Sequence, residues 1–110
     1  MMSVRLIDAT CPECRGPLRE IQEGELVEYE CLVGHRYGPS ALLHAHAEAQ
    51  ERALWAAVVA LEEAGELVRK AGPHLPPQTR SSLEQEAAGK AQQAEKIREI
   101  LHNLTPFRTS

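Results

Sequence analysis

The chain has 110 residues, of which 43% are apolar, and a formal net charge of −4. This length allows one compact domain or two small modules, and the acidic balance argues against a large basic surface for nucleic acid. No segment contains the roughly 18 uninterrupted apolar residues that a membrane-spanning helix needs, and the N-terminal residues lack the features of a secretory signal peptide. We therefore expect a cytoplasmic protein with no membrane insertion.

Three cysteines and one histidine form the most informative pattern in the chain. Cys11 and Cys14 are followed by Cys31 and His35, which gives the spacing C-x2-C-x16-C-x3-H. Three thiolates and one imidazole suit the tetrahedral shell of Zn²⁺, whereas a disulfide scaffold would leave one of three cysteines unpaired. The set predicts one structural zinc per chain, and thiols committed to zinc fit a reducing compartment. The alternative is three buried cysteines and an unrelated histidine.

The segment between the two pairs has the length and pattern of a β-hairpin. Residues 18–23 alternate weakly between apolar and polar, Gly24-Glu25 is a turn, and residues 26–32 alternate well. The second strand would lead directly into the third ligand, Cys31. Gly34 suits a turn that needs an unusual backbone angle next to His35. Together these features predict a zinc ribbon over residues 1–39.

The rest of the chain has a helical pattern. Gly38-Pro39-Ser40 ends the ribbon and offers Ser40 as an N-cap, and Gly72-Pro73 ends the helical run. Ser81 and Glu84 have the spacing of a capping box for a second helix, which Pro106 ends. We expect helices at about 40–71 and 82–104, forming an antiparallel hairpin within residues 40–110. The predicted fold class is α+β, mostly α.

Each predicted helix carries a seam of mainly apolar residues that steps by four and three, the heptad spacing of a coiled-coil pair. The seams are Leu43, Ala47, Gln50, Leu54, Ala57, Leu61, Ala64 and Val68 in the first helix, and Leu83, Ala87, Lys90, Ala94, Ile97, Leu101 and Leu104 in the second. The first helix is longer, so we expect its first turns to lie against the ribbon.

A second stripe would remain uncovered when the two seams pack together. It comprises Ala53, Ala56, Ala60, Leu67, Ala91 and Ile100. We therefore expect self-association, most simply as a two-fold dimer that forms a four-helix bundle. The alternatives are a monomer whose ribbon folds back over the stripe and a heterologous protein partner.

Other chemistry is less well supported. Four protein ligands leave no open position for water, so we expect a structural zinc and no enzymatic activity, with redox release of the metal as the alternative. Glu13 and Arg15 beside the ligands are interpreted as solvated surface charges.

His44 and His46 would point to nearly opposite sides of a helix and could not easily share an ion. Trp55 could be a core residue or an anchor for another chain, and we favour the core.

Many zinc ribbons bind nucleic acid, and the charge of the predicted ribbon tests whether this one could. Residues 1–40 contain four arginines, no lysine and seven acidic residues, a net charge of −3. Phosphate binding depends on clustered Lys and Arg, with stacking aromatics for single strands. We therefore predict a protein-interaction module, and a nucleic-acid or transcription-associated zinc-ribbon protein is the alternative.

The ligands lie within a longer pattern. It comprises Cys11-Pro-Glu-Cys14-Arg-Gly-Pro-Leu18, Cys31-Leu-Val-Gly-His35-Arg-Tyr37 and, further on, Ala53-Leu-Trp-Ala-Ala-Val58. Over residues 10–70 it resembles the C-terminal extension that follows the catalytic domain in some bacterial chemotaxis protein-glutamate methylesterase homologues. The resemblance implies association with bacterial signalling proteins. It does not imply esterase activity, because that family's Ser-His-Asp triad lies on a separate α/β domain that nothing here matches. Since the chain begins with its own methionines, we expect a stand-alone adaptor.

Overall fold

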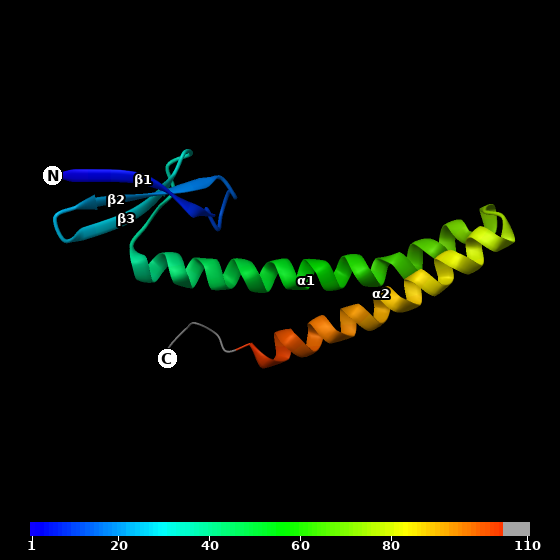
Figure 1. The fold of residues 1–110 in the computed structure, drawn as a ribbon. Coiled ribbons are helices and arrows are strands. Elements are labelled where there is room, and N and C mark those ends of the chain that lie inside the picture. Colours follow the sequence, from blue (N-terminus) through cyan, green and yellow to red (C-terminus); the bar gives the residue numbers. More distant parts are fainter. Residues whose placement is uncertain (105–110) are drawn as a thin grey trace. The chain divides into compact units, whose positions relative to one another are not determined.

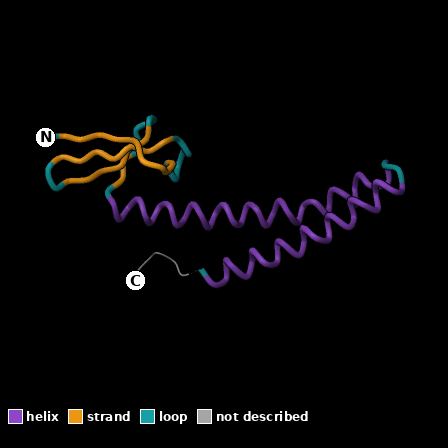
Figure 2. Tube along the Cα trace, viewed as in Figure 1, coloured by secondary structure: helices purple, strands orange, loops and turns teal. Residues whose placement is uncertain are grey.

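The structure, a computed structural model, describes residues 1–104 as an antiparallel sheet followed by two long helices (Figures 1 and 2). The strands are β1 (Met2–Thr10), β2 (Pro17–Glu23), β3 (Leu26–Cys31) and β4 (Arg36–Tyr37), and the helices are α1 (Pro39–Ala71) and α2 (Pro77–Asn103). A sheet followed by two long helices is what the α+β, mostly α prediction requires. None of the helices in this part of the chain is long and apolar enough to cross a membrane.

The sheet is a meander with the strand order β1-β2-β3-β4, and all neighbouring strands are antiparallel. The predicted hairpin is confirmed as β2 and β3, which pair from Leu18 with Cys31 to Glu23 with Leu26. Gly24 makes the turn with a φ of 64°, a left-handed conformation that costs glycine little. The sequence did not predict β1 or β4.

The core of the sheet is small and surrounds two of the cysteines. Cys11, Leu18, Cys31 and Tyr37 are buried together, and the half-buried residues Ile7, Tyr29, Leu42 and Ala45 pack against them. The last two of these belong to the first turns of α1, as expected for the longer helix. A core of four buried side chains supplies little hydrophobic stabilisation for about forty residues. The sheet therefore needs a further source of stability.

Contacts divide the chain into two units, one of residues 1–50 and one that begins at Glu51. The boundary lies within α1. Leu42 and Ala45, in the first turns of this helix, pack against the core of the sheet. The first turns of α1 therefore belong with the strands.

The start of α2 differs from the prediction. The helix begins at Pro77, after Pro76 in an extended conformation, so the predicted capping box at Ser81 is wrong. Proline at the first helical position lacks only an N–H that would be unpaired there anyway. Ser81 and Glu84 lie inside the helix, where the Glu84 carboxylate instead accepts a hydrogen bond from Arg80 at 2.9 Å.

In the second unit, the two helices pack through small residues. Val58, Ala87 and Ala94 are buried, and the larger seam residues are half-buried, namely Leu54, Leu61, Val68, Leu83, Ile97 and Leu101. The seams are confirmed in this unit apart from Lys90 and Leu104, which are exposed. Earlier in α1, Leu43 and Gln50 of the predicted seam are also exposed. The packing of this unit therefore leaves part of most large seam side chains open to solvent.

Trp55 is 44% exposed, so the prediction that it belongs to the core is wrong. The guanidinium of Arg98 lies 5.8 Å from the centroid of its ring, within the range of a cation–π interaction. Arg98 also donates to both carboxylate oxygens of Glu62, at 2.9 Å each. This group joins α2 to α1 at the surface of the hairpin.

Candidate metal centre

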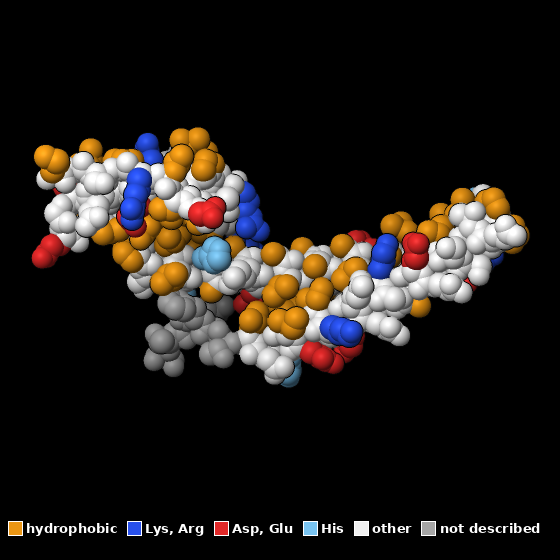
Figure 3. All heavy atoms as spheres, in the orientation of Figure 1, with side chains coloured by type: hydrophobic (Ala, Val, Ile, Leu, Met, Phe, Trp, Pro, Cys, Tyr) orange, Lys and Arg blue, Asp and Glu red, His pale blue; other side chains and the backbone are white. Residues whose placement is uncertain are grey.

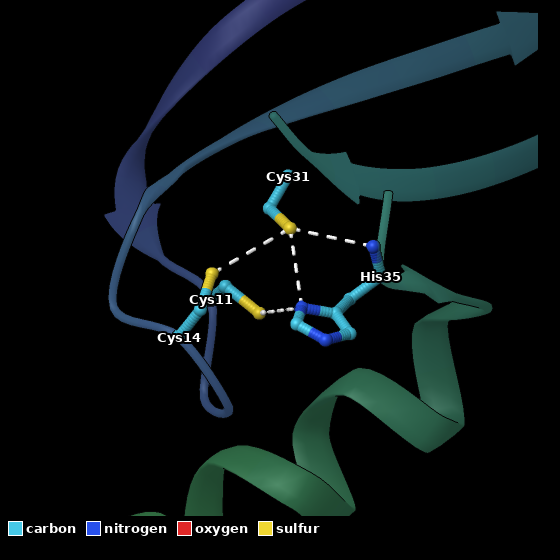
Figure 4. A group of neighbouring side chains, drawn as sticks. All are labelled: Cys11, Cys14, Cys31 and His35. Atoms are coloured by element: carbon cyan, nitrogen blue, oxygen red, sulfur yellow. Dashed lines mark hydrogen bonds between the residues drawn. The ribbon is translucent and has the colours of Figure 1, made fainter. Parts of the chain in front are cut away.

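The four predicted ligands converge from two turns of the sheet unit. Cys11 and Cys14 lie in the loop between β1 and β2, Cys31 ends β3, and His35 precedes β4. Their sulfur and nitrogen ligand atoms all lie within 4.8 Å of one another (Figure 4). In residues 1–104 this is the single group of three or more such side chains that could hold a metal ion. His44 and His46 are not part of it.

Three of the six separations between donor atoms are near those of a tetrahedral shell. Nδ1 of His35 lies 3.5 Å from Sγ of Cys11 and 3.3 Å from Sγ of Cys31, and Sγ of Cys14 lies 3.6 Å from Sγ of Cys31. Ligands at metal–sulfur and metal–nitrogen distances of about 2.3 Å and 2.0–2.1 Å would be about 3.6–3.8 Å apart in a tetrahedron. The donors are thus close to coordinating positions.

Backbone hydrogen bonds shape the first turn. The N–H of Cys11 donates to the carbonyl of Gly16 at 2.7 Å, and the N–H of Arg15 donates to the carbonyl of Cys11 at 2.8 Å. Arg15 has a φ of 66°, in the left-handed region that non-glycine residues seldom adopt. This tight loop brings Cys14 back toward Cys11.

The second turn has the same kind of closure. The N–H of Gly34 donates to the carbonyl of Cys31, and the N–H of Cys31 donates to the carbonyl of His35, both at 3.1 Å. Gly34 has a φ of 109°, which confirms the unusual backbone angle predicted for it. The N–H of His35 also donates to Sγ of Cys31 at 3.3 Å. The turn therefore positions two ligands and stabilises negative charge on one of them.

The surroundings of two cysteines favour the thiolate, the form that binds metal. Burial raises the pKa of Cys31. Hydrogen bonds from the backbone of its own turn and from Cys14 lower the pKa by more than burial raises it, to about 7. Burial likewise raises the pKa of Cys11, and hydrogen bonds from the backbone of its own turn reverse that effect, so its pKa is lowered. A backbone N–H lowers the pKa of Cys14, whereas burial and the two neighbouring thiols raise it by more.

Two residues beside the ligands were not predicted to take part. Glu13 was interpreted as a solvated charge; it is exposed, but its Oε2 lies 3.4 Å from Nε2 of His35. The Tyr37 hydroxyl donates to Oε1 of Glu13 at 2.5 Å and lies 3.6 Å from Sγ of Cys11. In the sequence, Glu13 lies between the ligands Cys11 and Cys14, and Tyr37 lies two residues after the ligand His35. It carried no signal that the two turns would bring them together.

Most of the positive charge of the sheet unit is paired. Glu30 accepts hydrogen bonds from Arg19 at 2.5 Å and Arg36 at 2.6 Å, and these two arginines lower its pKa. Arg5 lies 3.2 Å from Glu20. Three of the four arginines in the sheet unit are therefore bound to carboxylates, which weighs against a phosphate-binding surface.

No protein-family model, curated protein or solved structure matches the chain. The resemblance to the methylesterase extension therefore stays a prediction.

Proposed function

We propose that the chain is a non-enzymatic protein-interaction module whose sheet unit is a zinc ribbon with one structural Zn²⁺. The observation that carries the zinc assignment is the convergence of Cys11, Cys14, Cys31 and His35, with all ligand atoms within 4.8 Å. A tetrahedral set of three thiolates and one imidazole is typical of zinc among the metals available to proteins.

A structural role fits both the ligand count and the size of the core. Four protein donors fill a tetrahedral shell and leave no position where a metal-bound water could be activated. The four buried side chains of the sheet need additional stabilisation, and metal binding supplies folding free energy to small domains of this kind. Zinc would thus hold the sheet together.

The helical unit supports the interaction part of the proposal. It exposes the large apolar side chains of Trp55, Val59, Leu67 and Ile100, and Figure 3 shows hydrophobic side chains at the surface along both helices. The predicted second stripe is exposed in full. Exposed large apolar side chains are common at sites that bind other proteins.

A second copy of this chain is the partner that we propose for the stripe. Residues 51–104 contain seven basic and eight acidic side chains, so two hairpins would bring together surfaces of nearly balanced charge. A four-helix bundle would cover both stripes at once. From the resemblance, we further propose that the module acts as an adaptor in bacterial chemotaxis-like signalling, inside the cell.

Metal analysis tests the first part of the proposal. Protein purified under reducing conditions should contain one zinc per chain. Freshly reduced protein that contains no metal, and takes up none when zinc is added, would overturn the assignment.

Affinity capture from the native host tests the signalling part. With the reduced, zinc-loaded chain as bait, chemotaxis receptors or response regulators should be recovered. Recovery of RNA or RNA polymerase in their place would favour the transcription-associated alternative.

A further inference from the structure

Glu13 lies where the two metal-binding turns meet. It belongs to the first turn, between Cys11 and Cys14, yet its carboxylate contacts residues around the second. Oε2 of Glu13 lies 3.4 Å from Nε2 of His35, and Oε1 accepts a hydrogen bond from the Tyr37 hydroxyl at 2.5 Å. The carboxylate therefore links one turn to the other without using a ligand atom.

The two nitrogens of His35 face different groups. Nδ1 faces Cys11 and Cys31, as Figure 4 shows, and Nε2 faces the carboxylate of Glu13. A neutral imidazole carries its proton on only one nitrogen. For Nδ1 to offer its lone pair to a metal, the proton must be on Nε2. An ionised carboxylate can only accept a hydrogen bond, so Glu13 favours this tautomer.

Tyr37 limits the freedom of the carboxylate. Its hydroxyl lies 2.5 Å from Oε1 of Glu13 and 3.6 Å from Sγ of Cys11, so the shorter contact identifies Glu13 as its acceptor. This hydrogen bond holds the carboxylate of Glu13 in place.

We propose that Glu13 is the positioning residue of this metal centre, holding His35 in the tautomer and orientation that present Nδ1 to the metal. Tyr37 acts through Glu13 by orienting its carboxylate. The inference rests on the zinc site proposed above. Groups that hydrogen-bond to a metal-ligating histidine orient the ring and strengthen binding, and their removal weakens metal affinity by about 10–100-fold.

Zinc affinity measured by competition with a chromophoric chelator tests this role. We expect Glu13→Ala to weaken zinc binding about 10–100-fold. Glu13→Gln should fall between this variant and the wild type, because its amide oxygen can still accept a hydrogen bond but carries no charge. Glu25→Ala removes the same charge from the hairpin turn and should leave the affinity within about twofold, since exposed charges beyond about 10 Å are largely screened.

A second measurement separates positioning from a general effect on folding. In the zinc-loaded wild type, ¹⁵N spectra should show His35 protonated at Nε2, with that proton exchanging slowly with water. In zinc-loaded Glu13→Ala the same proton should exchange faster, while far-UV circular dichroism is unchanged. If Glu13→Ala cannot be loaded, Glu13→Gln provides this comparison.

Two results would overturn the role of Glu13. One is wild-type affinity together with an unchanged Nε2 proton in both Glu13 variants. The other is a loss of zinc affinity in Glu25→Ala equal to that in Glu13→Ala, which would show that the affinity depends only on the net charge of the chain. Failure of the wild type to bind zinc would instead overturn the proposed function itself, so the two failures are distinguishable.

Discussion

Gly34 and Arg15 show how single residues shape the two turns that carry the candidate metal ligands. Both have positive φ angles, of 109° and 66°, and only for glycine is this conformation free of strain. The ligands next to them depend on these angles, because each turn reverses the chain within a few residues. Replacing Gly34 would strain the backbone between Cys31 and His35.

Loss of one ligand should separate the stability of the two units. We expect Cys14→Ser to lose zinc and to disorder the sheet unit, because the four buried side chains cannot stabilise it alone. Helical circular dichroism should largely persist, since most of α1 and all of α2 lie beyond residue 50. Elemental analysis and the dispersion of amide NMR signals would measure the two effects.

Thr10→Ser provides the control for this substitution. It makes a similarly small change next to the first ligand but leaves the four donors intact, so zinc should be retained. A Cys14→Ser protein that keeps stoichiometric zinc and a folded sheet would contradict the ligand assignment.

Particular elements show what the sequence could predict. The β2–β3 hairpin was found because alternation, a Gly turn and a ligand position agreed. β1 was missed because eight of its nine residues are exposed and only Ile7 is half-buried. A strand with no buried face does not need alternating apolar and polar residues. The capping-box pattern at Ser81 was outweighed by Pro77, whose fixed φ suits an earlier helix start. Contacts such as that between Tyr37 and Glu13 join distant residues, and no local pattern encodes them.

The α1–α2 hairpin offers a matched pair of substitutions at adjacent positions. Val58 is fully buried, whereas Val59 is 52% exposed. Val58→Ala should lower the free energy of unfolding by about 1–2 kcal/mol, because two buried methyl groups are lost and a small cavity remains. Val59→Ala should cost well under half as much. Thermal unfolding followed by far-UV circular dichroism would compare them.

Equal losses of stability at the two positions would contradict the observed packing of the hairpin. A loss for Val59→Ala that grows with protein concentration would instead place Val59 in an interface between copies.

The sheet unit should bind DNA or RNA no better than a generic acidic protein of its size. Residues 1–40 have a net charge of −3, and Arg5, Arg19 and Arg36 are already paired with glutamates. Few free cations remain to displace counterions from a phosphate backbone. Fluorescence anisotropy with labelled oligonucleotides near physiological salt would measure this. Sub-micromolar binding that weakens steeply with added salt would support the nucleic-acid alternative.

At the scale of the whole molecule, the question is what covers the stripe on the hairpin. Its largest members, Leu67 and Ile100, are 65% and 52% exposed, and the remaining members are alanines that allow helices to approach closely. Isologous two-fold pairing is the commonest way for a soluble protein to bury such a surface. The seam residues between α1 and α2 are already engaged, so a test of self-association must change the stripe and spare the seam.

Leu67→Asp meets that requirement. If two copies pair through the stripe, multi-angle light scattering at micromolar concentration should give a dimeric mass for the wild type and a monomeric mass for Leu67→Asp, because a carboxylate buried without a partner costs several kcal/mol. Leu26→Asp makes the same chemical change at a 75% exposed position in the turn of the sheet and should remain dimeric. Zinc content should be unchanged in both variants, since neither residue is a ligand. A strictly monomeric wild type would remove the homodimer and leave a heterologous protein as the partner for the stripe.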